Sequence, residues 1–68
     1  MMLKCIFLNG GVRSFNLKYC VEIFYINNRI ELELLKGRNC VTVVLNSENI
    51  VNFPVVLEKI KTFLQQGE

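Results

Sequence analysis

The stretch that decides the fold is residues 15–34, which read FNLKYCVEIFYINNRIELEL. From Phe15 to Tyr25 every odd position is apolar and most even positions are polar, and this period of two is typical of a half-buried strand. Asn27–Asn28 then supplies a pair that tolerates the positive backbone dihedral angles of a two-residue turn. Apolar and charged residues alternate again over residues 29–34, so the stretch predicts a β-hairpin.

The register of this hairpin supports the assignment. The two-residue turn sets three apolar pairs opposite each other, namely Tyr25 with Ile30, Ile23 with Leu32 and Val21 with Leu34. A second two-residue turn at Gly37–Arg38, with glycine in the position that a type II′ turn prefers, adds Leu34 with Val41, Leu32 with Val43 and Ile30 with Leu45. Because the apolar residues coincide without a slip, the sequence predicts three consecutive antiparallel strands that share one buried face.

The segment before this unit predicts a further strand. Residues 2–9 are mostly apolar and are closed by Gly10 and Gly11, which are typical of a turn. A strict two-residue loop would set Lys4 against the apolar Leu17, so we expect a bulge or a longer loop in this first hairpin.

After Asn46 the apolar spacing changes from that of a strand to that of a helix. Apolar residues recur at positions 53, 56, 57, 60, 63 and 64 with polar residues between them. Pro54 is compatible only with the first turn of such a helix, and Gly67 provides a C-terminal stop. We expect Ser47–Val51 to form an irregular turn that leads into the helix.

The sequence therefore predicts one α+β domain over residues 1–68, a four-stranded antiparallel meander sheet followed by a C-terminal amphipathic helix packed on one face. The predicted strands span about residues 2–9, 13–26, 29–36 and 40–46, and the predicted helix spans about residues 52–66. In the predicted core, Ile23, Leu32 and Val43 lie side by side beneath Leu57 and Ile60.

The composition argues against an enzyme. The chain contains no His, Asp, Trp or Ala, and all six acidic residues are Glu. There is therefore no imidazole base, no carboxylate–histidine dyad and no mixed histidine metal site. We expect a binding protein without a cofactor.

The three cysteines indicate a reduced, intracellular protein, either cytoplasmic or nucleoid-associated. Cys5, Cys20 and Cys40 are odd in number and widely spaced, and no signal sequence precedes them. Cys20 and Cys40 are expected on the sheet face opposite the helix, which we call the outer face. They would lie about 9–10 Å apart across an intervening strand, which is beyond disulfide reach. We expect them to fill apolar space rather than to bind metal. No apolar run approaches the roughly 18–20 residues needed to cross a bilayer, so no membrane partner is expected.

The outer sheet face predicts a partner. Phe24, Ile26, Leu35 and Val44 are expected to point outward together. A domain this small has a marginal core, so we expect a homodimer that covers part of this face.

Two stretches resemble a known family. They are Lys36-Gly37-Arg38-Asn39 and the segment VLNSENIVNF at residues 44–53, and the predicted order of elements agrees over nearly the whole chain. Together they resemble the PUR domain and, more distantly, coactivators of the positive-cofactor type and the Whirly proteins. The resemblance implies single-stranded nucleic-acid binding by paired β-β-β-β-α units whose curved sheets carry bases and phosphates.

The charge distribution suggests where such a ligand would bind. Residues 1–46 carry six basic residues and three Glu, a net charge of +3, whereas the remainder carries two Lys and three Glu, a net charge of −1. The predicted nucleic-acid-binding residues, on or at the rim of the outer face, are Lys18, Phe24, Arg29, Lys36 and Arg38. Phe24 would stack on a base and the cations would neutralise phosphates.

One pair on the same face argues against this ligand, because Glu22 is expected directly opposite Glu33 and would repel phosphate. The sequence therefore leaves two functions open. One is a single-stranded DNA- or RNA-binding homodimer, and the alternative is a protein-interaction module, such as a small inhibitor or antitoxin-like partner, that uses the outer face. Base preference and the identity of a protein partner are not predicted.

Overall fold

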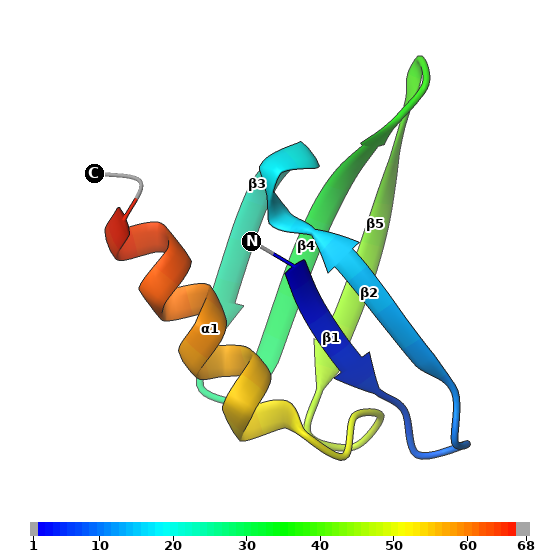
Figure 1. The fold of residues 1–68 in the computed structure, drawn as a ribbon, viewed down its shortest axis with the longest axis vertical. Coiled ribbons are helices and arrows are strands. Elements are labelled where there is room, and N and C mark those ends of the chain that lie inside the picture. Colours follow the sequence, from blue (N-terminus) through cyan, green and yellow to red (C-terminus); the bar gives the residue numbers. More distant parts are fainter. Residues whose placement is uncertain (1, 67–68) are drawn as a thin grey trace.

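The backbone follows the order β-β-3₁₀-β-β-β-α in a computed structural model that describes residues 2–66 (Figure 1). The strands are β1 (Met2–Ile6), β2 (Val12–Asn16), β3 (Cys20–Ile26), β4 (Arg29–Lys36) and β5 (Asn39–Asn46). A short 3₁₀ helix, η1, covers Leu17–Tyr19, and the α-helix α1 covers Phe53–Gln66. The α+β class predicted from the sequence is confirmed.

The predicted single four-stranded meander is wrong, because the strands form two antiparallel sheets. One sheet is the β1–β2 hairpin and the other has the order β3-β4-β5. The predicted strand 13–26 is divided at η1, where the chain turns from one sheet into the other. At this turn the Lys18 backbone N–H donates to the Asn16 side chain at 3.1 Å, a local hydrogen bond that competes with sheet pairing. Leu17 is buried at the turn and anchors it to the core.

The two-residue hairpins predicted for the three-stranded sheet are confirmed, but Asn27 and Asn28 form their turn without the expected positive φ angles, because among residues 2–66 only glycines have a positive φ. The β4–β5 pairs include Leu34 with Val41, Leu32 with Val43 and Ile30 with Leu45, and the β3–β4 pairs include Tyr25 with Ile30 and Ile23 with Leu32. The predicted pairing of Val21 with Leu34 is wrong, because the register shifts between Cys20 and Glu22 and Cys20 lies opposite Leu34. Such a bulge places two residues of one strand opposite one of the next, which leaves Val21 60% exposed.

Of the two alternatives expected for the first hairpin, a bulge or a longer loop, the structure has the longer loop. Strand β1 ends at Ile6 rather than near residue 9, and Ile6 pairs with Val12. The loop is closed by a hydrogen bond from the Phe7 N–H to the Gly11 carbonyl at 2.8 Å. Gly10 has a φ of 90° in this loop, a backbone conformation that favours glycine.

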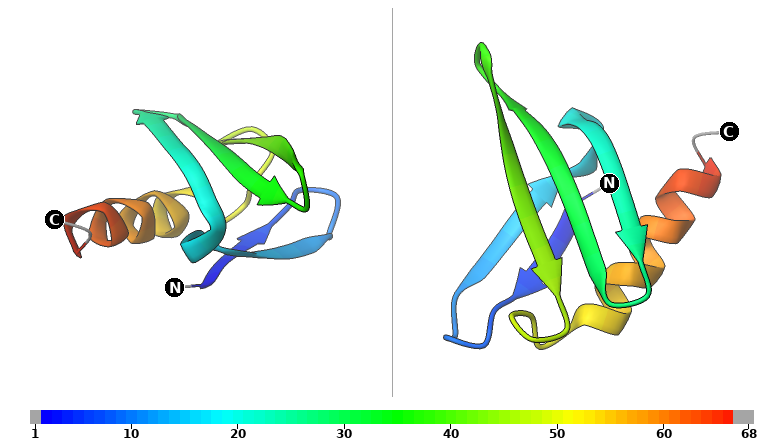
Figure 2. Two further views of the ribbon diagram at one scale, coloured as in Figure 1. Left: turned by 90° about the horizontal axis from the view of Figure 1, so that it is seen from above. Right: turned by 180° about the vertical axis from the view of Figure 1, so that it is seen from behind.

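The core lies between the two sheets and α1. Figures 1 and 2 show the β1–β2 hairpin across from the three-stranded sheet, with α1 alongside β3 and β1. The buried core residues are Leu3, Cys5, Leu17, Ile30, Leu32, Leu45, Ile50, Phe53, Val56 and Ile60. The predicted row of Ile23, Leu32 and Val43 is confirmed, with Leu32 fully buried between two half-buried neighbours. The inner face is covered by the hairpin together with α1, and not by the helix alone.

A short connection joins β5 to α1 and runs along β1. The Leu8 N–H donates to the Asn49 carbonyl at 3.1 Å, and the Val51 N–H donates to the Ile6 carbonyl at 2.7 Å. The predicted helix agrees with α1 to within one residue at its start, and Pro54 lies in its first turn as expected. Gly67, the predicted stop, lies outside the described residues. Over residues 2–66, no helix has both the length and the apolar character needed to cross a membrane.

Candidate binding groove between two strand edges

The structure does not gather the five predicted nucleic-acid-binding residues on one surface. Phe24 lies on the outer face of the three-stranded sheet and is 49% exposed. Arg29 forms an ion pair with Glu31, with 3.0 Å between Nε and Oε2. Lys36 ends β4 and Arg38 lies in the turn that follows, whereas Lys18 belongs to η1, outside the sheet.

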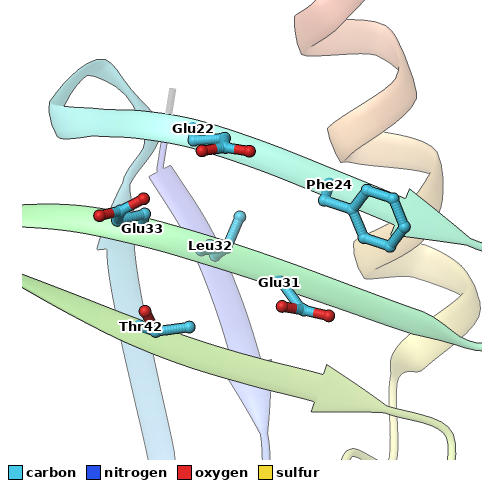
Figure 3. A pocket seen from close by; sticks show the side chains of 6 residues that line it. All are labelled: Glu22, Phe24, Glu31, Leu32, Glu33 and Thr42. Atoms are coloured by element: carbon cyan, nitrogen blue, oxygen red, sulfur yellow. The ribbon is translucent and has the colours of Figure 1, made fainter.

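The centre of the outer face is acidic. The predicted opposition of Glu22 and Glu33 is confirmed, and Glu31 lies opposite Phe24 in the same strand pair. Figure 3 shows these three carboxylates around a shallow hollow, which has a volume of about 110 Å³. A polyanion laid over the middle of this face would meet three carboxylates, only one of which is paired with a cation in the described part of the chain.

The cysteines do not form a shared site. Cys20 was predicted to face outward with Cys40, but the bulge in β3 turns it onto the core. Burial raises the pKa of the Cys20 thiol, and it raises the pKa of Cys5 to about 11, so both thiols remain protonated near neutral pH. Cys40 is exposed opposite Leu35. No group of three or more His, Cys, Asp or Glu side chains among residues 2–66 could hold a metal ion.

A groove runs between β2 and β5, and we call it the β2–β5 groove. It consists of two adjoining hollows of about 490 and 570 Å³ that share Arg13, Val41 and Val43. The first hollow is also lined by Ser14, Phe15, Asn16, Tyr19, Leu34, Leu35 and Lys36, and the second by Phe7, Asn9, Gly11, Val12, Thr42 and Val44. Consecutive residues of both strands line the groove, so the edges of the two strands border it.

The β5 edge of the groove carries unpaired backbone groups. Lys36 and Asn39 close the two-residue β4–β5 hairpin, and hydrogen-bonded and non-hydrogen-bonded pairs alternate from there along the strand. The even-numbered residues of β5 therefore direct their backbone groups away from β4. This assignment agrees with Asn49, whose side chain donates to the Val44 carbonyl at 3.1 Å and accepts from the Asn46 N–H at 2.8 Å. Within residues 2–66, the outward groups left without any hydrogen-bond partner are the N–H and C=O of Cys40 and Thr42 and the N–H of Val44.

Among residues 2–66, β2 pairs only with β1, so its other edge also carries backbone groups without a strand partner. The backbone groups of Ile6 bond to Val51 and to the Asn52 side chain, so Ile6 is not hydrogen-bonded to its β2 partner. By alternation, the residues of β2 that direct their backbone groups away from β1 are Val12, Ser14 and Asn16. Figure 2 shows β2 and β5 on the same side of the molecule, in different sheets.

The side chains of the groove are mainly apolar and its charges are all positive. Phe15, Val41 and Val43 supply apolar surface, while Arg13 and Lys36 are the charged residues among those that line it. The Arg13 guanidinium lies 6.0 Å from the centroid of the Phe7 ring, a cation–π distance that favours one position of the cation. The groove thus offers hydrogen-bond donors, hydrogen-bond acceptors and cations to a ligand.

Sequence reasoning missed this groove because it treated β2 and β3 as one strand. One signal was available, since residues 40–45 read CVTVVL, with neither charge nor proline, although they lie at the edge of the predicted sheet.

No protein-family model, curated protein or solved structure matches the chain.

Proposed function

We propose that the protein is a non-enzymatic binding module that holds a segment of a partner protein in the β2–β5 groove. The observation that carries this proposal is the pair of unpaired strand edges that border a mainly apolar groove. Unpaired backbone N–H and C=O groups at a strand edge are a template for another chain, and apolar side chains beside them provide area to bury.

The outer sheet face is a weaker candidate for this role. It has a shallow hollow of about 110 Å³, and its centre carries Glu22, Glu31 and Glu33. The β2–β5 groove is larger and more apolar, and its acceptors and donors lie in ordered rows along the strands. The protein-interaction function was predicted from the sequence for the outer face, and we instead assign it to the β2–β5 groove.

The test is a selection of displayed random peptides of about eight residues, the length of a typical strand, on the immobilised protein. Val41→Glu places a charge in the groove, and Val21→Glu is the matched control, since both residues are exposed strand valines (42% and 60%). We expect selected peptides to lose at least roughly tenfold in affinity for Val41→Glu and to bind Val21→Glu as they bind the wild type. Failure to select any peptide, or selected peptides that respond only to Val21→Glu, would contradict the proposal.

A second candidate is the single-stranded nucleic-acid binding predicted from the sequence. The observation that favours it is the position of Tyr19 and Lys36 in the same hollow as Arg13, with the Lys18 ammonium 6.0 Å from the Tyr19 ring. Exposed aromatic rings beside cations are the elements that bind unpaired bases and their phosphates.

This candidate predicts retention on a single-stranded oligonucleotide at low salt. With two phosphate contacts, at Arg13 and Lys36, a fourfold rise in salt should lower the affinity roughly sevenfold. Lys36→Gln should flatten that dependence, whereas Arg29→Gln, which removes a cation already paired with Glu31, is the control. If the two substitutions flatten the salt dependence equally, the nucleic acid binds on the outer face rather than in the groove. If the wild-type protein is not retained at low salt, nucleic-acid binding is ruled out.

A further inference from the structure

The unpaired edge of β5 has the geometry of a strand template. Cys40, Thr42 and Val44 present their backbone groups at every second residue, which is a spacing of about 7 Å along the strand. A helix or a compact loop cannot match such a row, whereas an extended chain repeats its own outward groups at the same interval. The chemistry of this edge therefore selects an extended polypeptide.

Strand β5 lacks the features that normally protect an edge. Its residues 40–45 include no charged residue and no proline, and its pairing with β4 continues from end to end without a bulge. Asn49 caps only the C-terminal end, through its bonds to Val44 and Asn46. An uncharged edge that is left open over residues 40–44 in this way is a hazard for aggregation unless a partner covers it.

The charges of the groove specify the partner further. Arg13 lies where the two hollows meet and Lys36 lies at one end, and no acidic residue is among the described residues that line the groove. A partner side chain with a carboxylate can reach Arg13 and form a charge-assisted hydrogen bond. Charge complementarity therefore favours an acidic segment over a neutral or basic one.

We infer that an extended, acidic peptide segment of a partner protein pairs with β5 as a fourth strand of the β3–β4–β5 sheet and places a carboxylate on Arg13. This inference rests on the proposed function and adds the binding mode and the chemistry of the partner. The partner's alternate side chains face the groove, where Val41, Val43 and Phe15 bury the apolar ones.

The composition of the selected peptides is the first test. From a display library of random octapeptides, we expect sequences in which every second residue, the one that faces the groove, is β-branched. We also expect these sequences to carry Asp or Glu. Their affinity should fall roughly tenfold or more for Arg13→Gln, because the charged hydrogen bond is lost. Peptides that bind the groove but are basic, rich in proline or indifferent to Arg13→Gln would overturn the inference and leave the proposed function intact.

The backbone contact is tested with Thr42→Pro, which removes an edge N–H. Since the Thr42 N–H points away from β4, proline there costs no bond within the sheet, and Thr42→Ser is the matched control that retains the N–H. The affinity of a synthetic selected octapeptide should drop roughly tenfold for Thr42→Pro and stay unchanged for Thr42→Ser. Equal affinity of all three proteins would overturn strand addition.

Hydrogen exchange keeps the test decisive even where Thr42→Pro fails to fold. In the free wild-type protein, the amides of Val41 and Val43 should exchange slowly and those of Thr42 and Val44 rapidly, since only the first pair bonds to β4. Saturation with the synthetic octapeptide should slow Thr42 and Val44 at least roughly tenfold. If these two amides are already slow in the free protein and sedimentation shows a dimer, the edge is covered by a second copy and the inference is wrong.

Discussion

Replacing Asn52 with Ala tests how the fold closes one edge of its first hairpin. The Asn52 side chain bonds to β1 in both directions, accepting from the Ile6 N–H and donating to the Lys4 carbonyl, each at 3.0 Å. Its own carbonyl accepts the Val56 N–H at 3.0 Å, at the start of α1. One half-buried residue therefore fastens the beginning of the helix to the strand.

The expected cost follows from the bonds that are lost. Each hydrogen bond contributes about 1 kcal/mol net, and a backbone group left unsatisfied away from water adds to the loss. The free energy of unfolding of Asn52→Ala should therefore be about 2–3 kcal/mol lower than that of the wild type. For a domain of this size, that loss corresponds to a fall in Tm of roughly 10–20 °C.

Urea unfolding followed by circular dichroism measures the difference. Asn9→Ala is the control, because the Asn9 side chain makes one exposed bond, from the Gly11 N–H at 2.9 Å, and its loss should cost about 0.5 kcal/mol. Asn52→Asp retains the acceptor for Ile6 but loses the donor to Lys4, so it should be more destabilising at neutral pH than at about pH 3, where the acid can donate. If Asn52→Ala costs no more than Asn9→Ala, these bonds do not hold the helix to the strand.

Three further predictions concern the core, a thiol and the oligomeric state. Leu32→Ala should lower the free energy of unfolding by roughly 2–5 kcal/mol, and a loss under about 1 kcal/mol would mean that the buried face is misassigned. Burial raises the Cys5 pKa from 9.0 to about 11, so the folded state holds this proton more tightly than the unfolded chain. The contribution of the protonated Cys5 thiol to the free energy of unfolding is therefore complete below about pH 9 and is lost as the pH rises to about 11, by at most about 3 kcal/mol. Denaturant titrations of Cys5→Ala should show no such loss of stability at alkaline pH. Phe24 and Leu35 leave large apolar areas exposed, and sedimentation at micromolar concentration should show the predicted homodimer, which a stable monomer would contradict.

The parts of the fold that could be predicted are those encoded by local patterns that agree with one another. Alternation over β4 and β5 and the Gly37–Arg38 turn both point to the same register, and every pair predicted between these two strands is present. The helix was predictable because its period of 3.6 and the position of Pro54 specify the same start.

The division of the predicted strand 13–26 could not be read from periodicity. Leu17 is apolar and falls in phase with the strand pattern, although it occupies the core from a 3₁₀ turn. A single side-chain bond, from the Lys18 N–H to Asn16, accompanies the change of direction, and Asn16 also satisfies a strand pattern. The bulge after Cys20 could not be predicted from the pattern either. Cys20 points inward where Val21 was expected to, and because both residues are apolar, the alternation fits either register.

The candidate site depends on that division. In a single meander, the two sheet edges would belong to the first and the last strand, with no reason to face each other. In the observed fold the connection at residues 49–52 covers the edge of β1, and the turn at η1 frees the edge of β2 and brings it beside β5. The β2–β5 groove is therefore a property of tertiary structure. Arg13, which the sequence places at a hairpin start, gains its role only when β5 lies across from it.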